Sequence, residues 1–85
     1  MREVRFTPLA QSQLKNWKAH DKKIYSRIEH LINNIQETPY KGIGKPEPLK
    51  HELTGYWSRR ITGEHRLVYK VTANAIIVVG CKYHY

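Results

Sequence analysis

The chain has 85 residues, which suits one domain spanning residues 1–85 with a modest core. Fifteen Lys and Arg against seven Asp and Glu leave a net charge of +8, which favours a polyanionic partner: nucleic acid first, then an anionic membrane or an acidic protein. A single cysteine excludes an internal disulfide, and no apolar run is long enough for a signal peptide or a membrane span, so we expect a soluble cytoplasmic protein.

The N-terminal residues predict a strand followed directly by a helix. Charged and apolar residues alternate there, which places Val4 and Phe6 on the core side of a half-buried strand. Thr7 is a favourable N-cap, and Pro8 suits the first helical position because its missing N–H has no partner there in any case. Apolar residues then recur at helical spacing as far as Trp17, which we expect to be core.

A second helix is the clearest element of the sequence. Asp21 is its expected N-cap, and Thr38 before Pro39 its expected end, because the residue before proline disfavours the helical conformation. Its apolar positions follow helical periodicity: Ile24, Ile28, Leu31, Ile32 and Ile35. The short joint between the helices predicts an antiparallel hairpin. Lysines around this joint form either a solvated face or an additional contact to phosphates.

A loop rich in glycine and proline, residues 40–48, separates the helices from a region of strands. Strands are predicted at residues 49–53, 56–61, 65–71 and 75–84, joined by short turns that require antiparallel pairing. The expected fold class is therefore α+β, in the order β-α-α-β-β-β(-β). Two antiparallel N-terminal helices pack on one face of a four- to five-stranded antiparallel sheet, and polar chemistry can occupy the other face.

Several polar residues do not fit a purely structural role. Glu47 is held between two prolines in a basic neighbourhood, either as a salt-bridge partner of a nearby lysine or as a catalytic base. Alternation along residues 56–61 places Arg60 on the face of Tyr56 and Ser58, and Arg66 of the next strand is a second candidate for that open face. Exposed arginines on a basic surface are the alternative interpretation.

The last residues add a histidine and a tyrosine to this set. His84 can exchange a proton near neutral pH, and Tyr85 offers a ring and a hydroxyl, although both can reach one site only if the final strand twists or ends near them. Cys81 and His84 lack the partners of a structural zinc site, so neither a metal nor another cofactor is predicted. A carboxylate, arginines, a histidine and a tyrosine together are what metal-independent RNA cleavage requires.

Four blocks of sequence resemble one known family. They are Gly44 to His51 (GKPEPLKH), Gly55 to Thr62 (GYWSRRIT), Glu64 to Tyr69 (EHRLVY) and Cys81 to Tyr85 (CKYHY). These blocks, in this order and at these intervals, resemble the YoeB toxins of bacterial toxin–antitoxin pairs, within the RelE superfamily. The match is dense over residues 39–85; over residues 1–38 only the strand-helix-helix plan agrees.

The resemblance implies a microbial-ribonuclease-like fold and cleavage of messenger RNA in the ribosomal A site. It also implies inhibition by a YefM-like antitoxin, and it is compatible with a homodimer. Residue by residue, it points to Glu47 as general base, His84 as general acid, Arg66 as the group that stabilises the transition-state phosphate, and Tyr85 as the group that positions the substrate. It further assigns phosphate binding to two basic residues, Lys50 and Arg60.

Two other classes of function remain open from the residues themselves. A noncatalytic basic RNA-binding module would share the charge and the aromatic residues, but it would have no use for Glu47, which repels phosphate. A protein-interaction domain would use its positive charge for an acidic partner and leave messenger RNA intact. Loss of cleavage on substitution of Glu47 distinguishes the enzyme from both.

Overall fold

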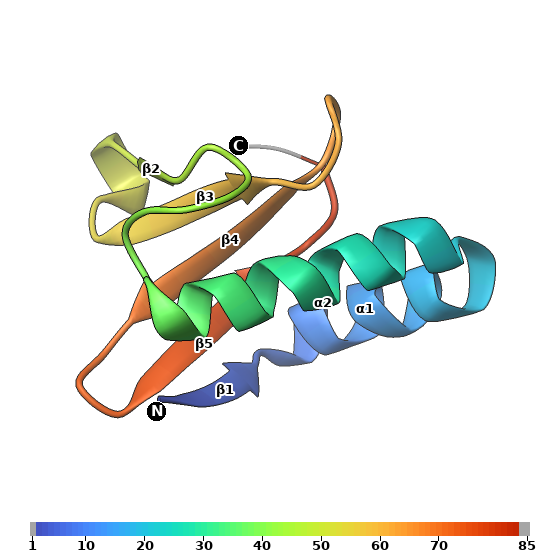
Figure 1. Cartoon of the computed structure of the whole chain (residues 1–85), viewed down its shortest axis with the longest axis horizontal. Helices are drawn as coiled ribbons and strands as arrows, with labels where there is room; N and C mark the ends of the chain where they lie inside the picture. The colour runs from blue at the N-terminus through green and yellow to red at the C-terminus, as the bar shows by residue number, and fades with distance from the viewer. Residues whose placement is uncertain (1, 84–85) are drawn as a thin grey trace.

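Two helices lie side by side across one face of a five-stranded sheet in the part of the chain that the computed structural model describes, residues 2–83 (Figure 1). The helices are α1 (Pro8–His20) and α2 (Lys22–Glu37). The strands are β1 (Glu3–Phe6), β2 (Glu47–Pro48), β3 (Tyr56–Arg60), β4 (Arg66–Val71) and β5 (Ala75–Gly80). The α+β fold class predicted from the sequence is confirmed.

Both helix starts follow the predicted capping chemistry. The Thr7 hydroxyl accepts a hydrogen bond from the Ala10 amide at 3.3 Å, and the Asp21 carboxylate accepts one from the Ile24 amide at 3.2 Å. The Asp21 amide in turn donates to the Trp17 carbonyl at 2.8 Å, so one residue closes α1 and opens α2. This single-residue joint produces the predicted helical hairpin.

The core lies between the helical hairpin and the sheet. Its fully buried side chains are Ala10 of α1, Ile28, Leu31 and Ile35 of α2, Leu67 and Tyr69 of β4, and Ile76 and Val78 of β5. Trp17 is also buried, as its spacing predicted, and Val4 and Phe6 pack against the cluster from β1. Within residues 2–83, neither α1 nor α2 covers the other face of the sheet, which is called here the open face; Ser58 and Val68 on it are nevertheless buried.

The sheet is mixed, which corrects one part of the prediction. Its strand order is β1-β5-β4-β3-β2, and the three pairings among β2, β3, β4 and β5 are antiparallel as expected. The first strand instead pairs in parallel with the last, with Val4 opposite Ile76. A parallel pair needs a long crossover connection, and here the rest of the chain supplies it.

Two predicted strands have different bounds in the structure. Residues 49–53 were expected to form a strand, but only Glu47 and Pro48 pair with β3, and His51–Leu53 forms a 3-10 turn. His51 adopts a left-handed backbone with φ of 59°, which no strand allows. The final strand was expected to reach residue 84 and ends at Gly80.

An irregularity precedes this early end of β5. The pairing of β4 with β5 shifts between Val68 and Tyr69, as in a β-bulge, and the Tyr83 backbone is left-handed with φ of 61°. His84 and Tyr85 were predicted to share a site only if the strand twists or ends at residue 84, whereas β5 already ends at Gly80. His84 and Tyr85 themselves lie outside the described residues.

Candidate active site

Glu47 lies on the open face, at the edge of the sheet. Its Cα partner across the β2–β3 ladder is Ser58, so its side chain shares a face with Ser58 and Arg60. The neighbouring Arg59 points the other way, toward α2. Glu47 is exposed, and within residues 2–83 it forms no ion pair with a lysine or arginine. Its carboxylate is thus available to accept a proton from a ligand on the open face.

Arg60 of β3 and Arg66 of β4 lie next to each other on the same open face. The two residues are direct partners across the β3–β4 ladder. Their pair lies two residues along each strand from the pair of Ser58 with Val68. Arg60 is exposed, whereas Arg66 is half-buried and its Nη1 donates to the Thr62 carbonyl at 3.3 Å. From strand spacings, the Glu47 and Arg66 backbones are about 12 Å apart, so their side chains can approach one ligand from two sides.

The strand register that places Glu47, Arg60 and Arg66 on the open face does not extend to Lys50. It is exposed and precedes the 3-10 turn, beyond the two residues of β2 that pair with β3. The side-chain alternation that places Glu47 therefore does not fix the direction of Lys50. It lies three residues from Glu47 on the same edge of the sheet.

Arg59 is a structural residue that the sequence analysis did not single out. It is fully buried, and its five N–H groups match five bonds: Nε to the Tyr69 hydroxyl at 3.0 Å, Nη1 to Asn34 Oδ1 at 2.7 Å and to the Ile43 carbonyl at 2.8 Å, and Nη2 to the Thr38 and Lys41 carbonyls at 2.8 and 3.1 Å. All five acceptors are neutral. Arg59 thereby holds the loop after α2, which leads to Glu47.

Tyr69 completes this buried network. Its hydroxyl donates to the Pro39 carbonyl at 2.7 Å while it accepts from Arg59. Burial raises the pKa of the Tyr69 hydroxyl, and the Arg59 guanidinium opposes that rise. The only sequence signal for the network is the pair of adjacent arginines, one of which must point inward because successive side chains on a strand alternate.

The segment after β5 is tied to both α1 and β4. The Trp17 indole donates to the Cys81 carbonyl at 2.8 Å, and the Cys81 amide donates to Gln13 Oε1 at 2.7 Å. The Tyr83 amide donates to His65 Nδ1 at 2.7 Å. Backbone bonds thus bring residues 81–83 to the start of β4, next to Arg66, immediately before His84 and Tyr85 in the sequence.

Cys81 is an internal group rather than a reactive one. It is fully buried, and its Sγ lies 3.7 Å from the Ala10 carbonyl. Burial raises the pKa of the Cys81 thiol to about 11, well above the range in which thiols react at neutral pH. Among residues 2–83, no three histidine, cysteine or acidic side chains are close enough together to hold a metal ion.

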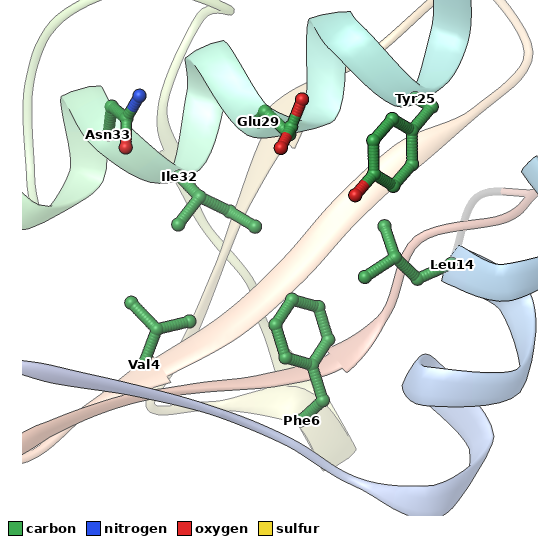
Figure 2. A pocket seen from close by; sticks show the side chains of 7 residues that line it. All are labelled: Val4, Phe6, Leu14, Tyr25, Glu29, Ile32 and Asn33. Carbon is green, nitrogen blue, oxygen red and sulfur yellow. The ribbon is translucent and has the colours of Figure 1, made fainter. Parts of the chain in front are cut away.

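A pocket of about 320 Å³ lies elsewhere, between β1 and the two helices (Figure 2). Val4 and Phe6 project into it from β1, Leu14 from α1, and Tyr25 and Ile32 from α2, as Figure 2 shows. None of Glu47, Lys50, Arg60 and Arg66 lines it.

No helix within residues 2–83 is long and apolar enough to span a membrane.

Comparisons with known proteins identify the family of the chain. Residues 6–85 match the family model described as the YoeB-like toxin of bacterial type II toxin-antitoxin system. Toxin YoeB of Escherichia coli K12 is 55% identical over 69 residues, which are 81% of this chain and 82% of that protein.

Two solved structures from Staphylococcus aureus share the fold. A YoeB dimer superposes with a TM-score of 0.93 at 47% identity, covering 99% of this chain and 98% of the other. A YoeB–YefM complex does so with a TM-score of 0.92 at 45% identity, covering 100% and 99%. The chain belongs to the YoeB-like toxin family of bacterial type II toxin–antitoxin systems.

Proposed function

We propose that this toxin cleaves messenger RNA in the ribosomal A site by metal-independent general acid–base chemistry. The 2′-hydroxyl of the RNA attacks the adjacent phosphorus, and the bond to the 5′-oxygen of the next nucleotide breaks. The products are a 2′,3′-cyclic phosphate, which can open to a 3′-phosphate, and a 5′-hydroxyl end. Translation stops because the message is cut. DNA is not a substrate since it lacks the 2′-hydroxyl.

In this proposal, the catalytic and binding roles fall to residues of the edge strand β2, of β3 and β4, and of the end of the chain. Glu47 removes the proton from the 2′-hydroxyl, and Arg66 offsets the charge that develops on the phosphorus-bound oxygens. His84 protonates the departing 5′-oxygen. Tyr85 positions the substrate and the leaving group. Lys50 and Arg60 bind neighbouring phosphates along the RNA backbone.

One observation carries this proposal: a carboxylate and two arginines share the open face, with the segment leading to the last two residues bound beside them. Strand register places Glu47, Arg60 and Arg66 on that face. The Arg66 amide donates to the Tyr83 carbonyl at 2.9 Å, which brings the final segment to the same strand. Cations alone would suit a simple RNA-binding surface, whereas an exposed carboxylate among them suits catalysis.

We also propose a YefM-like antitoxin as the partner that inhibits this protein. The support is the Staphylococcus aureus YoeB–YefM complex, whose toxin chain matches this one over almost its whole length. A homodimer is proposed on the same basis, from the Staphylococcus aureus YoeB dimer. Both assemblies can be tested by measuring the molar mass of the purified toxin, alone and with the antitoxin added.

The test of the proposed function is cleavage of messenger RNA on programmed ribosomes, with the new ends identified. We expect a 5′-hydroxyl end, and Glu47→Gln should lower kcat by about 10²- to 10⁴-fold, since that is the usual contribution of a general base. Glu37→Gln, an exposed acid at the end of α2, is the matched control and should cleave normally. A 5′-phosphate end, or undiminished cleavage by Glu47→Gln, would overturn the proposal. Intact messenger RNA with the wild-type toxin would favour the noncatalytic module.

A further inference from the structure

His65 binds the backbone of the final segment through one ring nitrogen. Its Nδ1 accepts a hydrogen bond from the Tyr83 amide at 2.7 Å, and the next residue, Arg66, donates its own amide to the Tyr83 carbonyl at 2.9 Å. Two consecutive residues thus bind both backbone groups of Tyr83. His65 is only 8% exposed, so its side of this partly buried bond is shielded from water.

The neighbours of the ring define its orientation. The ring packs edge-on against Trp17, with centroids 4.8 Å apart, and lies 5.5 Å from the Tyr83 ring. Because Nδ1 accepts from an amide, the proton of the neutral imidazole must be on Nε2. That nitrogen lies 3.5 Å from Glu64 Oε1, a carboxylate that favours a proton there. Both sides of the ring therefore select the same tautomer.

The bound residue needs such support because its backbone is strained. Tyr83 has φ of 61°, in the left-handed region that is unfavourable for a non-glycine residue. The bonds from the His65 ring and from the Arg66 amide compensate this cost. Without the Nδ1 acceptor, the partly buried Tyr83 amide would lose its partner, and extended conformations of the final segment would compete.

We propose that His65 is a positioning residue, whose Nδ1 lone pair fixes the backbone of Tyr83, the residue directly before the two proposed catalytic residues His84 and Tyr85. This inference rests on the proposed function, in which those two residues act on the scissile phosphate. His65 itself does not touch the RNA in this scheme. Its contribution is to kcat, because it determines the placement of catalytic groups and not the affinity for the message.

Two substitutions separate this role from simple packing. His65→Phe keeps a ring against Trp17 but removes the acceptor, whereas His65→Asn loses the ring but keeps an acceptor oxygen near the position of Nδ1. We expect His65→Phe to lower kcat about 10- to 100-fold with KM unchanged, and His65→Asn to stay within a few-fold of wild type. The reverse order would show that the ring serves only packing and would overturn the proposal.

A measurement on the wild-type protein remains decisive if either variant fails to fold. Nitrogen-15 NMR of the imidazole should show a protonated Nε2 and an unprotonated, hydrogen-bonded Nδ1, and hydrogen exchange should show a protected Tyr83 amide. A proton on Nδ1, or a rapidly exchanging Tyr83 amide, would overturn the proposal. These readouts do not involve RNA. If the wild-type toxin left messenger RNA intact while both signatures were present, the proposed function would fail and the His65 bond would not.

Discussion

Arg60 and Arg66 are directly opposed across the β3–β4 ladder, two positive charges on the same face of one sheet. Like charges in this position destabilise a sheet by a few tenths of a kcal/mol to about 1 kcal/mol. An anion between them would remove that cost. The pair therefore favours a phosphate on the open face even before any specific contact is made.

The two arginines should differ in their kinetic effects. Arg66 is half-buried and anchored to the Thr62 carbonyl, so it needs little reorganisation when charge develops, whereas Arg60 is exposed and can bind a ground-state phosphate. Arg66→Gln should lower kcat about 10²- to 10³-fold. Arg60→Gln should raise KM and reduce the salt dependence of RNA binding by about one phosphate contact. Steady-state cleavage and binding at several salt concentrations would check both. Equal effects of the two variants on kcat would contradict this division.

Removing the exposed Arg60 should also stabilise the free protein slightly. The expected gain is about 0.5 kcal/mol, because the opposed charges no longer repel each other. Urea denaturation at low salt measures it. The matched control is Lys70→Gln, on the same face of β4 but opposite Tyr56 and not opposite a cation. If Arg60→Gln changed stability no more than Lys70→Gln, the repulsion would be negligible.

Arg59→Lys should be much more harmful than its chemistry suggests. A lysine ammonium has three donors and no planar fork, so it cannot replace the five bonds that Arg59 makes to the loop after α2. We expect a loss of about 2–4 kcal/mol in the free energy of unfolding. Arg60→Lys, one residue further and exposed, should stay within about 0.5 kcal/mol of wild type. Comparable losses for both would rule out the special role of Arg59.

Gly44 should resist substitution because the loop approaches the core closely there. A Cβ at this position would lie 2.7 Å from the Leu31 Cδ2 atom, and the backbone is left-handed with φ of 78°. Gly44→Ala should cost about 1–3 kcal/mol and, by displacing the loop that leads to Glu47, reduce cleavage. The control is Gly63→Ala, where a Cβ would meet nothing within 4 Å. Equal melting temperatures for the two variants would contradict the crowding argument.

Cys81 predicts a pH dependence of stability in the alkaline range. Its pKa is raised from an ordinary 9.0 to about 11 in the folded protein, so the folded state holds the thiol proton more tightly than the unfolded state does. The stability that this provides is complete below pH 9 and is lost as the pH rises through 11. Cys81→Ala should lack this component, so the stability difference between wild type and variant should narrow between those values. A constant difference would show that the thiol does not titrate as described.

The helices were predictable from the sequence because their signals are local. Thr7 and Asp21 carry the capping groups themselves, and the spacing of the apolar residues in α2 fits only a helix. The faces of β3 and β4 were predictable for a similar reason, because alternation must separate Arg59 from Arg60. The parallel partner of β1 was not, as nothing within residues 3–6 encodes which distant strand they meet. The contact of His65 was not predictable either. Its partner is a backbone amide 18 residues away, and every residue except proline has such an amide, so the residue types do not indicate the contact.

The strand order has a consequence for how the toxin is made. β5 lies between β1 and β4, so the strand that is synthesised last of the five is the one that joins the first strand to the remainder of the sheet. While β5 is still inside a ribosome, β1 has no strand to pair with, and the helical hairpin lacks Ile76 and Val78 to pack against. The sheet can therefore not be completed partway through translation, because β1 joins β4 only after residues 75–80 have left the ribosome.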